Sequence, residues 1–204
     1  MTMSYWGEYT GELKLSRKLT VIEVDYLQAF FDSRRMTRSV LALESLPDPL
    51  REVVGLPIGP DGSYYVGSTF PEDHDPSVIN ENVPPGGQPG LWRDFDVSDD
   101  GGSLISGDTD HLNPERHTEW ITYLIVNFLS PWGIHLSGTL SWQGEDYLDT
   151  GVIVVEEDSA WATRGILMYG LDGTPRRLRV FLCHASEDKP RVRRLKKTTG
   201  DSRR

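Results

Sequence analysis

The chain has 204 residues, of which 37% are hydrophobic and 25% charged, and its formal net charge is −10. This length suits one domain of ordinary size and part of another, and six Trp and eight Tyr indicate a packed core rather than disorder. No apolar run is long enough to predict a membrane-spanning helix, and residues 1–9 do not resemble a signal peptide. The single Cys183 excludes an internal disulfide and predicts a cytoplasmic protein.

Charge is distributed unevenly along the chain. Residues 176–204 contain eleven Lys or Arg and three Asp or Glu, whereas residues 1–175 contain ten basic and 28 acidic side chains. An acidic body of this kind should bind duplex nucleic acid poorly, because phosphate binding requires clustered positive charge. The basic tail is compatible with docking to nucleic acid or to an acidic partner. The tail has no aromatic residue after Phe181, which favours a solvated tail, or one that folds back onto the acidic body.

The first predicted elements are a strand and a capped helix. Apolar or small residues alternate with polar ones from Tyr9 to Leu15, which predicts a strand with one buried face. Thr20 and Glu23 have the spacing of a capping box, and apolar residues then recur at helical intervals, so a helix is predicted to about residue 34. Basic residues at its end are expected to favour the helix dipole rather than to bind phosphate. They are Arg34, Arg35 and Arg38.

Turns dominate the next part of the chain. A weaker helical stretch at residues 39–54 is interrupted by two prolines, and a short strand is predicted at residues 64–66. A long polar loop follows at residues 69–90, and loops of this length are usually functional or disordered. Three prolines in its second half argue for an ordered loop with a defined shape. Strands at residues 91–97 and 103–106, joined by Asp-Asp-Gly-Gly, predict a hairpin.

A core helix is predicted after Asn113, which is placed to cap it, with Pro114 at its first position. The helix should run to about Leu129, because a broad apolar face continues that far. Three further strands are predicted at residues 135–143, 151–155 and 161–169. The sequence therefore predicts an α+β domain over residues 5–169: a mostly antiparallel sheet with two main helices on one face.

A different pattern follows a predicted linker at residues 170–177. An apolar strand at residues 180–183 precedes the polar loop His-Ala-Ser-Glu-Asp-Lys, and Pro190 stands where a helix can start. This order is how a parallel α/β domain opens. The sequence Phe-Leu-Cys-His-Ala-Ser-Glu-Asp-Lys at residues 181–189 resembles the opening strand and loop of a bacterial TIR domain, which has a flavodoxin-like fold. Residues 178–204 are therefore expected to form a truncated TIR-like segment with a basic tail.

The TIR resemblance implies an activity that this chain is not expected to show. Many bacterial TIR domains cleave NAD⁺ at the nicotinamide–ribose bond, as an NAD⁺ nucleosidase, often in antiviral defence. The resemblance implies that His184 and Ser186 would lie near the nucleotide pocket of an intact domain, with NAD⁺ as substrate and no other cofactor. The family's catalytic glutamate belongs to a later helix, and Glu187 is not its counterpart. No catalytic residue is therefore assigned, and enzyme activity is left open.

Partners are also implied rather than identified. Intact TIR domains self-associate, and the N-terminal domain would respond to an unknown protein or small-molecule trigger. Two further stretches resemble a family of small bacterial and phage proteins with no established activity, which implies a fold unit and no chemistry. These stretches are N-x-P-P-x-G-Q-P-G-L-W at Asn82 to Trp92, and W-x-G-E-D with D-x-G-x-I-x-V, beginning at Trp142.

Two clusters combine carboxylates with imidazoles, the ligand types that suit several divalent ions. They are Asp73, His74 and Asp75, and Asp108, Asp110, His111 and His117. Neither has a diagnostic spacing, so no metal site is assigned. A third acidic group can be an acid–base pair or a plain surface turn, and the turn is favoured. It consists of Glu145, Asp146 and Asp149.

Aromatic and sulfur side chains have structural interpretations. Three tryptophans on apolar faces are expected in the core rather than in a ligand stack: Trp92, Trp120 and Trp142. Cys183 is expected to be a small buried residue rather than a reactive thiol.

Three functions are compatible with the sequence. The first is a recognition or regulatory module of a TIR-domain defence protein, not catalytic in this truncated form. The second is a stand-alone binding module with a basic C-terminal docking tail, and the third, least favoured, is a metal-dependent hydrolase. The apolar pattern stops after Leu195, and both a frameshift and a natural C-terminus are compatible with this change.

Overall fold

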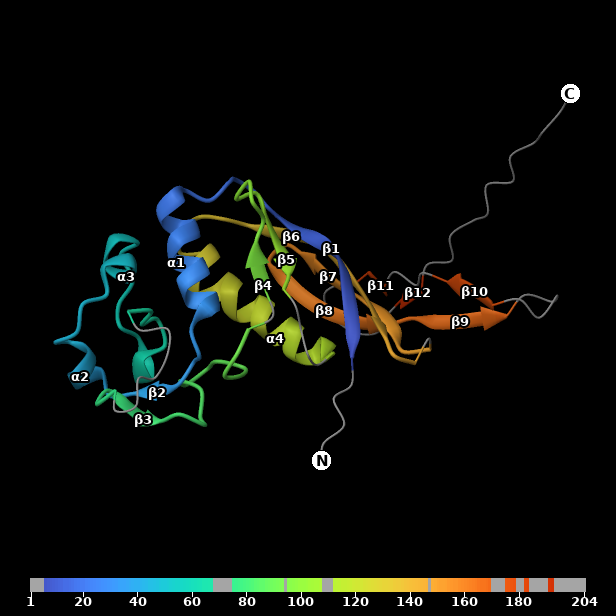
Figure 1. Cartoon of the computed structure of the whole chain (residues 1–204). Helices are drawn as coiled ribbons and strands as arrows, with labels where there is room; N and C mark the ends of the chain where they lie inside the picture. Colours follow the sequence, from blue (N-terminus) through green and yellow to red (C-terminus); the bar gives the residue numbers. More distant parts are fainter. Residues whose placement is uncertain are drawn as a thin grey trace, which may run out of the picture.

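The computed structural model describes residues 6–67, 75–93, 95–107, 112–146 and 148–169, together with three short strands near the C-terminus. The described chain is an α+β fold in which one antiparallel six-stranded sheet is covered on one face by the two main helices, α1 and α4 (Figure 1). The predicted fold class is therefore confirmed.

The sheet is organised around β1 (Gly7–Leu15), which lies between β5 and β6. Its strand order is β4-β5-β1-β6-β7-β8, and all neighbouring strands are antiparallel. The other strands are β4 (Phe95–Val97), β5 (Ser103–Ser106), β6 (Leu136–Gly144), β7 (Thr150–Glu156) and β8 (Ser159–Arg164). Leu13 is fully buried while its neighbours in β1 are exposed, as the alternation predicted.

Both main helices start at the caps that the sequence predicted. In α1 (Val21–Asp32), Thr20 Oγ1 accepts from Glu23 N at 3.3 Å and Glu23 Oε2 accepts from Thr20 N at 2.7 Å. Asn113 caps α4 (Pro114–Leu124), which continues as a π-helical segment, η2 (Ile125–Leu129). π-Helical turns are rare and occur frequently at functional sites. Within the described residues, no helix has the length and apolar character needed to cross a membrane.

The core lies between these helices and the sheet. Phe30 of α1 makes edge-to-face contacts with Trp120 and Phe128, with ring centroids 6.3 and 4.9 Å apart. Trp142 of β6 completes the core from the sheet and is almost fully buried. The prediction of a central core helix is confirmed, as is the burial of Trp120 and Trp142.

A small subregion extends beyond the end of α1 that leads into β2 (Figure 1). It contains β2 (Thr37–Arg38), α2 (Val40–Leu43), α3 (Pro49–Val53), the 3₁₀ turn η1 (Pro60–Gly62) and β3 (Val78–Asn80). The strand predicted at residues 64–66 is absent from this described region. Tyr65 N donates to Gly62 O, and Val66 N donates to Asp48 Oδ2 at 3.1 Å. A turn and a carboxylate therefore satisfy backbone groups that would otherwise need a sheet partner.

Four short strands pair in the C-terminal part. β9 (Ile166–Tyr169) pairs with β10 (Pro175–Leu178), which overlaps the predicted linker, and β11 (Leu182–Cys183) pairs with β12 (Arg191–Val192). The helix predicted to start at Pro190 is wrong at residues 191–192, which form an antiparallel strand. A short isolated helix is marginal in water, whereas pairing with β11 satisfies backbone groups.

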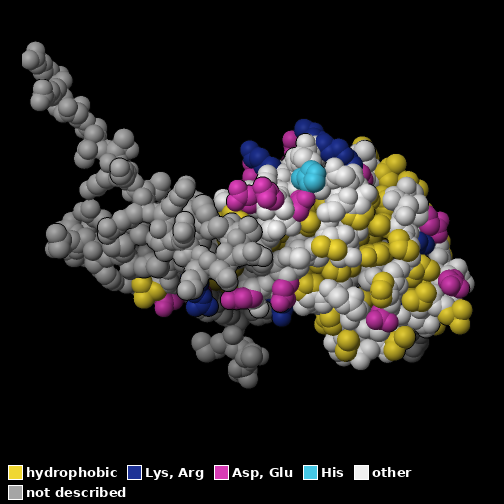
Figure 2. Space-filling model, turned by 180° about the vertical axis from the view of Figure 1, so that it is seen from behind, with side chains coloured by type: hydrophobic (Ala, Val, Ile, Leu, Met, Phe, Trp, Pro, Cys, Tyr) yellow, Lys and Arg dark blue, Asp and Glu magenta, His cyan; other side chains and the backbone are white. Residues whose placement is uncertain are grey.

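The surface of the described body reflects its acidic composition. Figure 2 shows Asp and Glu side chains spread over one face, whereas Lys and Arg side chains gather mainly at its upper edge. On the face that Figure 2 shows, the described residues do not form a broad basic surface.

The backbone conformation of the turn between β7 and β8 leads to a testable prediction about stability. Glu157 and Asp158 both have positive φ, 50° and 60°, in a two-residue hairpin turn that favours Asn or Gly. Replacing exposed Glu157 by Asn should raise the free energy of unfolding by about 0.5–1 kcal/mol, measured by urea denaturation. Asp158→Gly should gain less, because the Asp158 carboxylate contacts His135 Nδ1 at 2.6 Å and accepts from Leu136 N at 3.0 Å. Equal gains from both variants would contradict this account.

Candidate functional site

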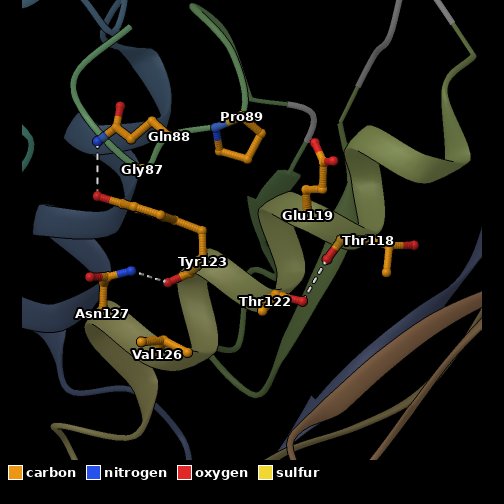
Figure 3. A pocket seen from close by; sticks show the side chains of 9 residues that line it. All are labelled: Gly87, Gln88, Pro89, Thr118, Glu119, Thr122, Tyr123, Val126 and Asn127. Atoms are coloured by element: carbon orange, nitrogen blue, oxygen red, sulfur yellow. Dashed lines mark hydrogen bonds between the residues drawn. The ribbon is translucent and has the colours of Figure 1, made fainter.

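A groove of about 570 Å³ lies between the outer face of α4–η2 and the loop that contains residues 87–89 (Figure 3). We refer to it as the α4 groove. Its lining residues are Gly87, Gln88, Pro89, Thr118, Glu119, Thr122, Tyr123, Val126 and Asn127. The loop is the second half of the long polar segment that the sequence predicted to be ordered.

One wall of the groove is a helical face. Thr118, Thr122 and Val126 recur every four residues and therefore lie along one side of α4–η2. The Thr118 hydroxyl donates to Pro114 O at 2.8 Å, and the Thr122 hydroxyl donates to Thr118 O at 2.9 Å. Because both hydroxyl protons are used within the helix, these oxygens can interact with a ligand only as acceptors.

The other wall is held by Gln88, whose side chain is buried. Its Nε2 donates to Ser63 O at 2.7 Å and to the Tyr123 hydroxyl at 2.9 Å, and its Oε1 accepts from Arg35 Nε at 3.2 Å. Figure 3 shows the bond that joins Gln88 to Tyr123 across the groove. A single side chain thus connects the loop, α4 and the end of α1.

Arg35 lies behind Gln88 and is only 2% exposed. Its guanidinium donates to Ser63 O at 2.8 Å and Tyr65 O at 3.1 Å, and it stacks 4.3 Å above the Phe30 ring. Burial lowers the pKa of Arg35 to about 10, so the group remains a cation at neutral pH. The prediction that Arg35 favours the dipole of α1 is wrong: backbone carbonyls more than 25 residues away determine its position.

The two other arginines predicted to favour the helix dipole also have different partners. Arg34 Nη2 donates to Asn82 Oδ1 at 3.2 Å, while Arg38 forms a buried ion pair with Asp75 and donates to Ser77 Oγ at 2.6 Å. Burial raises the pKa of Asp75, but hydrogen bonds from Ser77 and Arg38 outweigh it, and the net shift is downward. Helix α1 ends at Asp32, with no basic residue in its last turn.

The π-helical end of the groove is fixed by Asn127. Its Nδ2 donates to Tyr123 O at 2.9 Å, and its Oδ1 accepts from the Tyr64 hydroxyl at 2.6 Å. Burial raises the pKa of Tyr123, which therefore stays protonated at neutral pH. The polar groups that line the groove are thus positioned by the protein itself.

The predicted Asp/His clusters do not form a metal site in the described residues. Asp75 pairs with Arg38, and residues 73, 74, 108, 110 and 111 lie outside the described chain. His117 is buried and stacks on Tyr9 with ring centroids 3.9 Å apart. Burial lowers its pKa to about 3, so it is neutral at physiological pH. No group of three His, Cys, Asp or Glu side chains in the described part is placed to hold a metal ion.

The acidic residues after Trp142 shape a hairpin loop. Glu145 Oε1 accepts from Trp6 N at 2.9 Å, Asp146 Oδ1 accepts from Leu148 N at 2.9 Å, and Asp149 Oδ1 accepts from Trp142 Nε1 at 3.5 Å. These bonds support the surface-turn interpretation. The acidic side chains of this stretch therefore accept hydrogen bonds from two backbone N–H groups and one indole N–H.

Trp92 differs from the other tryptophans, because it is 50% exposed. The prediction that it belongs to the core is wrong. The loop that carries it is held at two places, where Leu91 O accepts from Arg35 N at 2.7 Å and Val83 O accepts from Thr37 N at 2.9 Å. A backbone fixed in this way leaves the Trp92 side chain partly in solvent. In the sequence, Trp92 follows the groove-lining Pro89 by three positions.

Sequence reasoning identified the loop but missed the residues that make it a site. Gln88 and Arg35 are 53 positions apart, and no local pattern links them. Tyr123 lies on the broad apolar face that the sequence predicted for the helix after Asn113, and that pattern indicates no binding role. His184 and Ser186, the residues implied by the TIR resemblance, lie outside the described chain.

Comparisons with models of known protein families, with curated proteins and with solved structures found no match.

Proposed function

We propose that the α+β body of this chain is a recognition module and that its binding site is the α4 groove. The observation that carries the proposal is the preorganisation of the groove. Gln88, Tyr123 and Asn127 are hydrogen-bonded within the protein, so they need not be ordered when a ligand binds. Preorganised groups improve affinity because less conformational entropy is lost on binding.

The groove is better suited to binding than to catalysis. Among its lining residues, Glu119 carries the only carboxyl group, and Tyr123 stays protonated at neutral pH. In nucleophilic catalysis, the nucleophile and its base are held within hydrogen-bond reach of each other. The Thr118 and Thr122 hydroxyls instead donate to helix carbonyls. These features support a recognition site.

The resemblance of residues 178–195 to the opening of a TIR domain suggests what the module regulates. We extend the proposal to a regulatory role in an NAD⁺-cleaving, defence-type protein of the cytoplasm. The alternative, a stand-alone binding module with a basic docking tail, uses the same groove. Because the resemblance covers only an opening strand and loop, the purified chain should release no nicotinamide from NAD⁺. Measurable release would overturn the regulatory proposal.

A pair of matched variants tests the groove. Val126 in the groove and Val53 on α3 are 61% and 62% exposed, so arginine at either position should leave folding intact. Val126→Arg should weaken ligands of the groove by about tenfold or more, because the longer side chain fills it. Val53→Arg should have no effect.

The measurement is a screen of small-molecule fragments against ¹⁵N-labelled protein by two-dimensional NMR. Wild type and Val53→Arg should show shifts concentrated at the amides of residues 87–89 and 118–127. Loss of those shifts in Val126→Arg alone would support the site. Fragments that bind elsewhere, or that bind Val126→Arg equally well, would refute it.

A further inference from the structure

The α4 groove carries a charge that indicates what it binds. Glu119 is the only charged residue among its lining residues, and it is exposed. Its carboxylate makes no hydrogen bond or ion pair with any residue that the structure describes. The remaining lining side chains are neutral. A cation placed in the groove would therefore gain a counter-charge, whereas a phosphate or carboxylate would meet a like charge.

The two arginines near the groove are not among its lining residues. Arg35 is buried behind Gln88 and cannot touch a ligand, and two carbonyl oxygens, Gln88 and the Phe30 ring surround its guanidinium. Arg116 lies near Gly90, beyond the residues that line the groove. Residues 1–175 carry 28 acidic and ten basic side chains, so the field of the whole body attracts cations.

The neutral part of the groove matches the rest of a basic side chain. Pro89 and Val126 provide apolar contact, and the Thr118 and Thr122 oxygens provide acceptors. Lys and Arg combine an apolar stem with a charged head that donates hydrogen bonds. The two kinds of surface lie together in one groove, so a single side chain can use both.

We propose that the α4 groove binds a basic side chain, Arg or Lys, presented by a partner polypeptide, with Glu119 as its counter-charge. This inference rests on the proposed function. A polypeptide is favoured over a free small cation because Trp92, which follows Pro89 by three positions in the sequence, is half-exposed. Tryptophan is among the residues that contribute most to protein–protein interfaces.

The test uses three blocked tripeptides that differ only in a central arginine, glutamine or glutamate, titrated into ¹⁵N-labelled full-length chain at low salt. The arginine peptide should bind about two- to fivefold more tightly than the glutamine peptide, as an exposed ion pair contributes. The glutamate peptide should bind most weakly, and added salt should reduce the differences. Glu119→Gln should abolish the preference. Glu115→Gln, an identical change one turn earlier on α4 and outside the groove lining, should preserve it.

The outcomes separate this inference from the proposed function. If all three peptides shift groove amides equally, the groove binds ligands but the preference for a cation is refuted. If none shifts groove amides, both proposals fail. If benzamidine, a small cation, binds the groove more tightly than the arginine peptide, the polypeptide partner is refuted. A preference that persists in Glu119→Gln would exclude Glu119 as the counter-charge.

Discussion

Replacing Arg35 by methionine will lower the free energy of unfolding by about 3 kcal/mol, and by more if no water enters the site. Methionine fills much of the same volume but donates no hydrogen bond. Tyr65 O and Gln88 Oε1 would then lose their donor, while Ser63 O would keep only the bond from Gln88 Nε2. Each buried acceptor left unpaired costs about 1 kcal/mol or more. Arg35→Lys should also destabilise, because an ammonium cannot reproduce the planar fork.

Urea denaturation measures this effect, with Arg116→Met as the control. Arg116 is exposed on α4 and makes no ion pair with described residues, so its replacement should change stability by less than about 0.5 kcal/mol. Hydrogen exchange adds a second measurement. Arg35→Met should reduce the protection of the Gln88 amide, since the Gln88 side chain loses its bond to the Arg35 guanidinium, although the backbone bonds at Leu91 and Val83 remain. A stable Arg35→Met with unchanged loop protection would show that the arginine does not hold the groove.

Replacing Gly151 by alanine will also destabilise the fold, by about 2–3 kcal/mol. Glycine to alanine within a strand normally stabilises by about 0.5–1 kcal/mol, so the expected sign is reversed. A Cβ at Gly151 would lie 2.2 Å from the Trp142 ring and 2.5 Å from Thr163 O. Gly90→Ala is the control, because its Cβ would meet no heavy atom closer than 3.6 Å.

A double-mutant cycle identifies the cause of the Gly151 effect. In a Trp142→Leu background, Gly151→Ala should cost about 1 kcal/mol less than in the wild type, because the ring clash is removed. Part of the cost should remain, because the Thr163 carbonyl belongs to the paired strand β8. Unfolding by urea gives all four free energies. A coupling of zero would mean that the backbone contact alone makes glycine necessary.

Local patterns predicted most of the fold. The alternation in β1, the Thr20–Glu23 capping box and the Asn113 cap of α4 all appear in the structure. These features could be predicted from the sequence because strand alternation and helix capping involve residues at most a few positions apart. The hairpin turn before β5 could be predicted from the sequence for the same reason. The loop of residues 82–90 was also expected to be ordered, since its prolines restrict the backbone.

Local sequence patterns did not predict the candidate site. The positions of Arg35 and Gln88 depend on carbonyl and hydroxyl groups that come from distant parts of the chain. The exposure of Trp92 depends on how Leu91 bonds to Arg35, and nothing in the composition of the loop indicates it. A polar side chain can have many partners, and folding selects among them by geometry.

The sequence by itself determined the α+β class, the ends of the two main helices and the pairing faces of β1 and β6, because these follow from short-range periodicity and capping. Only the tertiary structure decided that Arg35 is buried and bonded to Gln88, that residues 191–192 form a strand and that α4 and the loop line an open groove. Hydrogen bonds and packing between distant segments decide these features, since buried polar groups must find partners wherever the fold places them.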